Sequence, residues 1–271
     1  MSGISPEALA DWTASVGRTE TQVQRLEVES VRRFALAAGD DPDVERRLPP
    51  LAHWAFFLPA PADDGIGEDG HPRRGGFLPA ITLPRRMFAS AEIRFEAPLL
   101  LGEEAELTSA VAAVTHKSGR SGDLVFVEVD RLIAQAGTPR VRERQHYVYR
   151  QDGAPTPLPV PADLPDGEVW QPDAVNLFRF SAATFNGHRI HYDLPYARDV
   201  EGYPALVVHG PFTATRLAGL AARHGALAAF SFRAQAPLFL GQPIVLQGGP
   251  EEFRAIRCDG AVATTAKAGY R

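Results

Sequence analysis

The hydrophobic pattern of the chain is the same in both halves: segments with helical spacing come first, and runs typical of strands follow. Helical spacing predicts four main helices, over 6–16, 28–38, 173–184 and 210–224. Alternating or β-branched runs predict strands over 89–95, 105–114, 124–135, 140–150, 226–236, 242–248, 252–258 and 261–270. The pattern predicts an α+β protein in which each of two antiparallel sheets wraps a helix.

A short motif occurs twice and indicates a duplication. Arg94–Gly102 (RFEAPLLLG) recurs as Arg233–Gly241 (RAQAPLFLG), at an offset of 139 residues. A weaker echo pairs Arg33–Asp40 with Arg179–Asn186, in the same order along the chain. Because both echoes keep their order, helical segment first and strand segment second, the chain is predicted to consist of tandem modules.

A proline-rich segment separates the two copies. Residues 151–167 contain five prolines, which lack amide donors and favour extended backbone. We therefore predict an N-terminal module over 1–150, a linker over 151–170 and a C-terminal module over 171–271. Within the first module, residues 65–76 are rich in Gly, His and charge, which predicts a loop.

Composition narrows the class of protein. The chain has 271 residues, is 45% hydrophobic, and carries a formal net charge of −5 with a pI near 5.9, which argues against a nucleic-acid partner. Its apolar runs are too short to span a membrane, and the acidic N-terminal segment does not resemble a secretory signal. Cys258 is the single cysteine, which excludes internal disulfides. These features predict a cytoplasmic protein with no nucleic-acid or membrane partner.

The densest polar cluster of the second half is Phe185–Asp193 (FNGHRIHYD), a predicted loop after a helix. In an extended stretch, His191 and Asp193 face the same side. A neutral imidazole can take a proton from water and return it, so His191, His188 and Asp193 are candidate acid–base groups. A purely structural histidine pair is the alternative. A metal site formed by these three residues is disfavoured because there is no helical His-Glu frame and no nearby cysteine, so we predict no metal.

A second candidate feature is the start of the longest apolar helix, at Val207–Thr213 (VVHGPFT). Pro211 fits the first turn, and Gly210 leaves its N–H accessible at the positive end of the helix. Such a donor suits a thioester oxygen that gains negative charge during a reaction. The alternative is that His209 and Gly210 form only a tight helix entry.

These residues resemble the MaoC-type hydratase family of hotdog proteins. That family carries an Asp-x-Asn-Pro-(Ile/Leu)-His-x-Asp loop and, about eighteen residues later, a helix that opens with His-Gly. Ile190, His191 and Asp193 match the loop, and His209-Gly210 falls at the expected distance. Asn186 stands where the family has its acid, and an amide cannot act as a base. The resemblance therefore implies His191 as the acid–base residue, helped by His188 or working alone while Asn186 holds water or the thioester.

The same loop, together with 75–79 (GGFLP) and 83–87 (LPRRM), resembles a narrower branch of that family. The branch contains mesaconyl-C4-CoA (3-methylfumaryl-CoA) hydratases, itaconyl-CoA hydratases and type 2 3-hydroxyacyl-thioester dehydratases. It implies a double hotdog fold built from the two tandem modules. In the N-terminal copy, Asp40 corresponds to Asn186, but Glu45 replaces the histidine five positions later. That copy is therefore expected to be catalytically degenerate.

Several basic residues are candidate substrate contacts. Guanidinium groups suit phosphate or carboxylate oxygens, so we expect Arg85 or Arg86 to contact the coenzyme A phosphates or a free carboxylate on the acyl chain. Arg189 and His209 are further candidates for substrate contacts. Solvated basic side chains are the alternative.

The resemblance implies a hydro-lyase that adds water to a 2-enoyl-CoA, or removes it. The most specific expectation is a branched C5 dicarboxylic substrate, mesaconyl-C4-CoA or itaconyl-CoA, converted to citramalyl-CoA. The alternatives are a dehydratase of fatty-acid type, a hotdog acyl-CoA thioesterase, and a non-catalytic acyl-CoA-binding subunit. We expect no cofactor besides the coenzyme A of the acyl-CoA substrate, and a monomer or homodimer.

Overall fold

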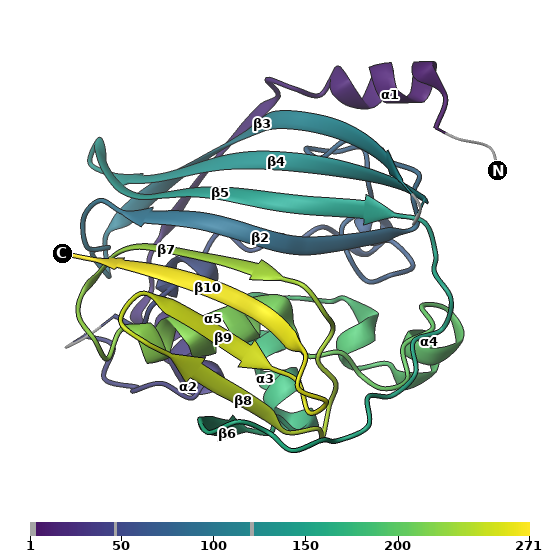
Figure 1. The fold of residues 1–271 in the computed structure, drawn as a ribbon. Helices are drawn as coiled ribbons and strands as arrows, with labels where there is room; N and C mark the ends of the chain where they lie inside the picture. The colour runs from purple at the N-terminus through teal and green to yellow at the C-terminus, as the bar shows by residue number, and fades with distance from the viewer. Residues whose placement is uncertain (1–3, 46–47, 120–121) are drawn as a thin grey trace.

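The computed structural model describes residues 4–45, 48–119 and 122–271, and its main feature is one antiparallel sheet of ten strands (Figure 1). The strand order is β1-β3-β4-β5-β2-β7-β10-β9-β8-β6. The strands are β1 (Thr19–Arg25), β2 (Arg85–Phe95), β3 (Glu104–Gly119), β4 (Gly122–Gln135), β5 (Thr138–Arg150), β6 (Glu168–Trp170), β7 (Leu227–Ala234), β8 (Ile244–Gly248), β9 (Glu252–Ile256) and β10 (Val262–Tyr270). The helices are α1 (Pro6–Thr13), α2 (Val28–Ala38), α3 (Ala174–Thr184), α4 (Leu194–Asp199) and α5 (Gly210–Ala221).

The two copies of the repeated motif meet at the centre of the sheet, where β2 pairs with β7. Ser90 lies opposite Arg233, and Arg94 lies opposite Ala229. The offset of 139 residues converts each of these pairs into the other. The two modules are therefore related by a pseudo-twofold axis. The pairing of β2 with β7 joins the two predicted sheets into one.

In the C-terminal half the sheet wraps a helix, as predicted. The helix α5 packs against β7, β8, β9 and β10, and α2 and α3 lie beside it (Figure 1). Phe34 of α2 and Phe180 of α3 have ring centroids 6.0 Å apart, so the helices that carry the weaker echo also touch each other. The main hydrophobic core lies between these helices and the sheet.

The N-terminal half departs from the prediction, because no described α-helix takes the position that α5 has in the C-terminal half. The segment that corresponds to α5 by the repeat offset lies in the loop-rich stretch before β2. Apolar residues of that stretch pack on the sheet together with Trp12 of α1: Phe77, Leu78, Ile81 and Leu83. Gly75-Gly76 and two prolines in this segment oppose helix formation. The missing helix leaves room for a cavity between the two halves.

The predicted elements agree with the structure except at some ends. The helices α1 and α5 end earlier than predicted, and β2 and β3 are longer. Two strands were missed. β1 is largely polar, because it pairs only with β3 and much of it is exposed, and β6 lies inside the predicted linker but pairs with β8. Residues 151–167 contain no helix or strand, as predicted. In the described part of the chain, no helix is long and apolar enough to cross a membrane.

Candidate active site

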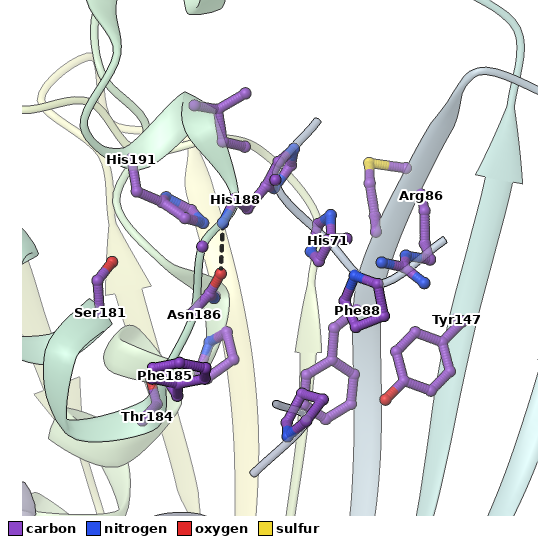
Figure 2. A pocket seen from close by; sticks show the side chains of 18 of the residues that line it. His71, Arg86, Phe88, Tyr147, Ser181, Thr184, Phe185, Asn186, His188 and His191 are labelled. Atoms are coloured by element: carbon purple, nitrogen blue, oxygen red, sulfur yellow. Dashed lines mark hydrogen bonds between the residues drawn. The ribbon is translucent and has the colours of Figure 1, made fainter. Parts of the chain in front are cut away.

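His191 faces a cavity of about 1390 Å³ that lies between the two halves (Figure 2). It sits at the end of a 3₁₀ turn, Arg189–His191, and is 7% exposed. Its Nδ1 donates to the carbonyl oxygen of Val207 at 2.7 Å, which fixes the neutral tautomer with a free lone pair on Nε2. The geometry therefore presents a proton acceptor to the cavity.

The surroundings of His191 keep it neutral. Burial, followed by the nearby His209 and His188, lowers its pKa well below the usual 6.5. The His209 ring stacks on that of His191, with centroids 3.6 Å apart and planes 21° apart. At physiological pH this imidazole can accept a proton from water.

His209 supports His191 from behind. It is fully buried, and its Nε2 lies 2.9 Å from Oγ of Ser181 on α3. Burial, followed by the charge of His188, lowers its pKa to about 3, so this ring stays neutral. His209 is not among the residues that line the cavity, so the structure places it as a support for His191 rather than as a substrate contact.

Gly210 lines the cavity at the first residue of α5. The first amides of a helix have no helical acceptor and point along the positive end of its dipole. Val207, whose carbonyl oxygen holds His191, lies three residues before Gly210 in the chain. The predicted donor and the predicted base therefore lie in one site. A Cβ on residue 210 would meet the nearest atom at 3.7 Å, so the glycine is not required for space alone.

Asn186 follows Phe185, whose φ of 48° ends α3 in the left-handed conformation. Its Oδ1 accepts a hydrogen bond from the backbone N–H of His188 at 3.0 Å (Figure 2). The two amide hydrogens on its nitrogen remain as donors, and the residue lines the cavity. Asn186 can therefore hold a water or carbonyl oxygen, but it cannot take a proton.

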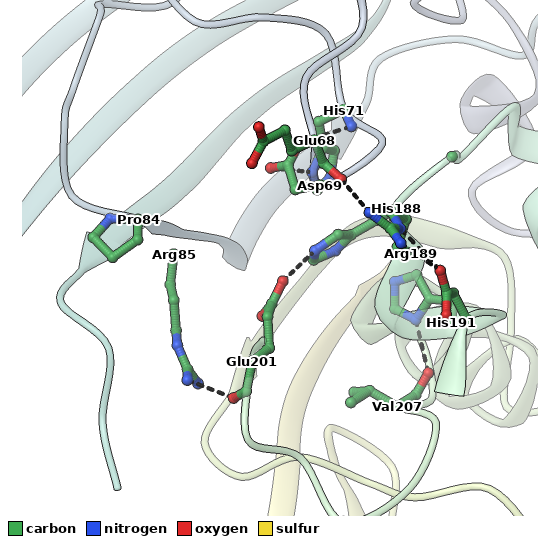
Figure 3. A network of polar contacts seen from close by, with 12 residues as sticks. Glu68, Asp69, His71, Pro84, Arg85, His188, Arg189, His191, Glu201 and Val207 are labelled. Carbon is green, nitrogen blue, oxygen red and sulfur yellow. Dashed lines mark hydrogen bonds and ion pairs between the residues drawn. The ribbon is translucent and has the colours of Figure 1, made fainter. Parts of the chain in front are cut away.

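His188 is paired with an acid that the sequence analysis did not identify. Its Nε2 lies 3.0 Å from Oε1 of Glu201, and both side chains are nearly buried (Figure 3). The Glu201 carbonyl accepts a hydrogen bond from Arg85. One signal was available, since Glu201 is the only charged residue in the apolar segment 200–208.

A second histidine–acid pair reaches the site from the N-terminal half. His71 Nδ1 lies 3.1 Å from Oδ2 of Asp69, and its ring lies against that of His188 with centroids 4.1 Å apart (Figure 3). Burial is the largest influence on His71 and lowers its pKa to about 3 despite Asp69. The predicted loop 65–76 thus completes the site, although only an Asp-x-His spacing pointed to it.

The loop that carries His71 contacts residues 185–193, the candidate catalytic loop, through Gly70 and Gly187. Gly70 has φ +85°, and a Cβ there would overlap the carbonyl oxygen of Gly187. We expect Gly70→Ala to separate the two loops and lower kcat/KM about 10- to 100-fold, because small displacements of catalytic groups are costly. Steady-state assays test this.

Gly137→Ala is the matched control for Gly70→Ala. Gly137 has φ +74° but nothing within 4 Å of an added Cβ, so it imposes the same backbone strain without the overlap. A folded Gly70→Ala protein with the turnover of the control would show that the close approach of Gly70 to Gly187 is not needed for activity.

Asp193 and Arg189 lie away from the cavity. The expectation that Asp193 shares an extended face with His191 is wrong, because a 3₁₀ turn intervenes. Asp193 caps α4 through the Tyr196 amide and pairs with Arg189 at 2.7 Å. Arg189 also stacks on the Tyr196 ring, 4.1 Å from its centroid. Neither residue lines the cavity, and both hold the catalytic loop in shape.

The two candidate arginines point to opposite sides of β2. Arg85 is 6% exposed and binds Asp152 and the Glu201 carbonyl, so it is not placed to contact a substrate. Arg86 lines the cavity, opposite the catalytic loop. In the N-terminal copy, Asp40 and Glu45 do not line the cavity, and the catalytic degeneracy of this copy stays a prediction.

One group of described residues has the spacing of metal ligands. Donor atoms of Asp69, His71 and His188 lie within 4.8 Å of one another. The structure uses these side chains in the hydrogen bonds to each other and to Glu201. The prediction of a site without metal stays a prediction.

Comparisons with solved structures agree with this fold. A double hotdog protein from Mycobacterium tuberculosis superposes with a TM-score of 0.55 at 12% identity, covering 93% of this chain and 95% of that one. A MaoC-like dehydratase from Phytophthora capsici superposes with a TM-score of 0.68 at 14% identity, covering 97% and 98%. The fold is therefore a double hotdog, as predicted. Its cavity contains a buried neutral histidine beside the start of α5.

The sequence comparisons identify the family. The family model described as hydroxyacyl-thioester dehydratase type 2 matches residues 51–240. A mesaconyl-C(4)-CoA hydratase from Chloroflexus aurantiacus is 46% identical in an alignment 275 positions long. The alignment covers 95% of this chain and 97% of that protein. The chain belongs to the type 2 hydroxyacyl-thioester dehydratase family. The predicted class of enzyme, a hydro-lyase, is confirmed.

Proposed function

We propose that this enzyme adds water to a branched C5 dicarboxylic 2-enoyl-CoA such as mesaconyl-C4-CoA. The observation that carries the proposal is that the free Nε2 of His191 and the first amide of α5 face one cavity. The relative from Chloroflexus aurantiacus, named as a mesaconyl-C(4)-CoA hydratase, supports this choice of acyl group.

In the proposed mechanism, the Gly210 N–H donates a hydrogen bond to the thioester oxygen and stabilises its negative charge. His191 Nε2 removes a proton from water while the water oxygen bonds to the β-carbon. The electron pair of the double bond moves toward the thioester and forms an enolate, whose oxygen is stabilised by Gly210. The His191 imidazolium then returns the proton to the α-carbon on the same face, which completes a syn addition.

The remaining polar groups hold the water. Asn186 can donate an amide hydrogen to the water oxygen, leaving a lone pair for the β-carbon. His188, held by Glu201, lies beside His191 with ring centroids 5.4 Å apart and stands at the same cavity wall. In this scheme the hydrogen-bonded pair His188–Glu201 occupies the role of the acid that Asn186 cannot fill. We expect no cofactor besides the coenzyme A of the substrate. The oligomeric state, monomer or homodimer, stays a prediction.

The reaction type is tested by following two signals in one assay. With mesaconyl-C4-CoA, we expect the absorbance of the conjugated enoyl-thioester to fall while no free thiol appears. Release of coenzyme A thiol at the same rate would indicate a thioesterase instead. Binding without any change in absorbance, on mesaconyl-C4-CoA, itaconyl-CoA and crotonyl-CoA alike, would indicate a non-catalytic subunit.

A further inference from the structure

The cavity wall contributed by the N-terminal half carries positive charge. Two arginines of the inner sheet face, Arg86 and Arg131, line this wall. Arg131 has a partner, because its Nη1 lies 3.7 Å from Oε2 of the buried Glu143. Arg86 has no carboxylate within 4.0 Å in the part of the chain that the structure describes. Arg86 is therefore a cation of this wall that no described carboxylate neutralises by direct contact.

The strand β2 directs Arg86 at the catalytic loop. Arg86 and Phe88 face the cavity, whereas Arg94, further along the same strand, is exposed on the outer face. Figure 2 shows the Arg86 side chain between His71 and Tyr147. The His71 ring in turn lies against that of His188, so one imidazole ring separates the guanidinium from His188.

The described carboxylates near Arg86 are bound to other side chains and do not pair with its guanidinium. Asp69 is taken by His71, and the Tyr147 hydroxyl donates to Gln145 at 2.7 Å. Glu143 receives Trp54 at 2.9 Å and Gln145 at 3.0 Å in addition to Arg131. A guanidinium in this setting suits a planar anion, which it can bind through two parallel hydrogen bonds.

We propose that Arg86 binds the free carboxylate of the acyl chain and so selects a dicarboxylic acyl-CoA. This inference rests on the proposed function, in which the carboxylate is attached to the carbon that water attacks. The carboxylate must then lie within a few bonds of the catalytic water, and Arg86 is the cavity cation next to the His71–His188 contact. The coenzyme A phosphates are separated from the thioester by the whole pantetheine arm, so they require a cation further from the histidines.

The test measures binding of two saturated acyl-CoA analogues that cannot be hydrated. Methylsuccinyl-CoA with the thioester at C4 keeps the carboxylate, and isovaleryl-CoA has a methyl group in its place. Calorimetry on the wild-type enzyme should give a clearly lower Kd for methylsuccinyl-CoA. Arg86→Gln should weaken that binding about 10- to 150-fold, the scale of a charged hydrogen bond, and should reduce the preference by the same factor.

Two further variants make the result decisive. Arg94→Gln removes a cation from the exposed face of the same strand and should leave both Kd values unchanged. Arg86→Lys keeps the charge but lacks the planar guanidinium with its two parallel donors. It should therefore keep part of the preference for methylsuccinyl-CoA, even if Arg86→Gln lowers the stability of the protein. Turnover does not enter this measurement, so failure of the proposed hydration is seen separately in the absorbance assay.

Three results would overturn the inference. The first is equal binding of the two analogues by the wild-type enzyme. The second is an equal loss for both analogues in Arg86→Gln and Arg86→Lys, which would place Arg86 against coenzyme A or in the fold. The third is an unchanged preference in the folded Arg86→Gln protein.

Discussion

Replacement of His191 by alanine is expected to lower kcat for hydration by about 10² or more, the usual scale for loss of a general acid–base group. The buried imidazole presents Nε2 to the cavity while Nδ1 is held by the Val207 carbonyl, and the other cavity groups do not reproduce this arrangement. Binding of the saturated analogue should change little, because the lost interaction acts mainly in the transition state.

Rates of His191→Ala are compared with those of His116→Ala, in which a histidine remote from the cavity loses its contact with Asp123. The control should keep wild-type turnover. A His191→Ala enzyme with a rate near that of the control would refute the assignment of His191 as the base. The pH profile gives a second reading: since burial lowers the pKa of His191 well below 6.5, its neutral form persists on acidification, and kcat/KM should not fall as pH decreases through 6.5.

The second large effect is expected on stability, at Glu143 in the inner wall. This carboxylate is 4% exposed and is contacted by Trp54, Gln145, His53 and Arg131. Glu143→Ala leaves these donors without their acceptor, and removal of one partner of a buried charged cluster costs about 3–5 kcal/mol. Chemical denaturation should show a loss of this size in the free energy of unfolding.

The pH dependence of that loss follows from the Glu143 pKa. Burial by itself raises this pKa, but the contacts with His53, Arg131 and Gln145 outweigh it and lower the value to about 2. The stabilisation is therefore complete above the ordinary pKa of 4.5 and disappears as pH falls from there toward 2. The difference between wild type and Glu143→Ala should shrink over the same range.

Asp130→Ala is the control for the stability measurement. Asp130 pairs with Arg144 at 2.7 Å, but both side chains are nearly half exposed, so its loss should cost less than about 1 kcal/mol. Equal loss of unfolding free energy in the two variants would show that the buried contacts of Glu143 stabilise the fold no more than an exposed ion pair does.

Local patterns in the sequence were sufficient for the features that depend on local order. The repeat predicted the tandem modules, and the two copies of its motif begin at symmetric positions of the β2–β7 pair. The histidine loop and the helix start were found because both lie in short continuous segments. The helix missing from the N-terminal half was not anticipated, since the repeat itself suggested that each module would keep one.

Contacts between distant segments could not be predicted in the same way. Glu201 reaches His188 only because α4 turns the chain back, and His71 arrives from the other module. Adjacent arginines on a strand point to opposite faces, but the sequence did not decide which of Arg85 and Arg86 faces inward. A 3₁₀ turn at Arg189–His191 separates His191 from Asp193, and the two-residue spacing of these side chains gave no sign of it.

The pseudo-twofold pairing of β2 with β7 has a consequence for the evolution of this enzyme. In a symmetric pair of identical modules, every change made for substrate choice also alters the module that performs the chemistry. Covalent fusion removes that coupling, because each copy accumulates substitutions separately. Here the C-terminal copy carries His191 and Gly210, and Arg86 and Glu143 belong to the other. New acyl preferences can therefore arise by mutation of one half while the reaction centre in the other is preserved.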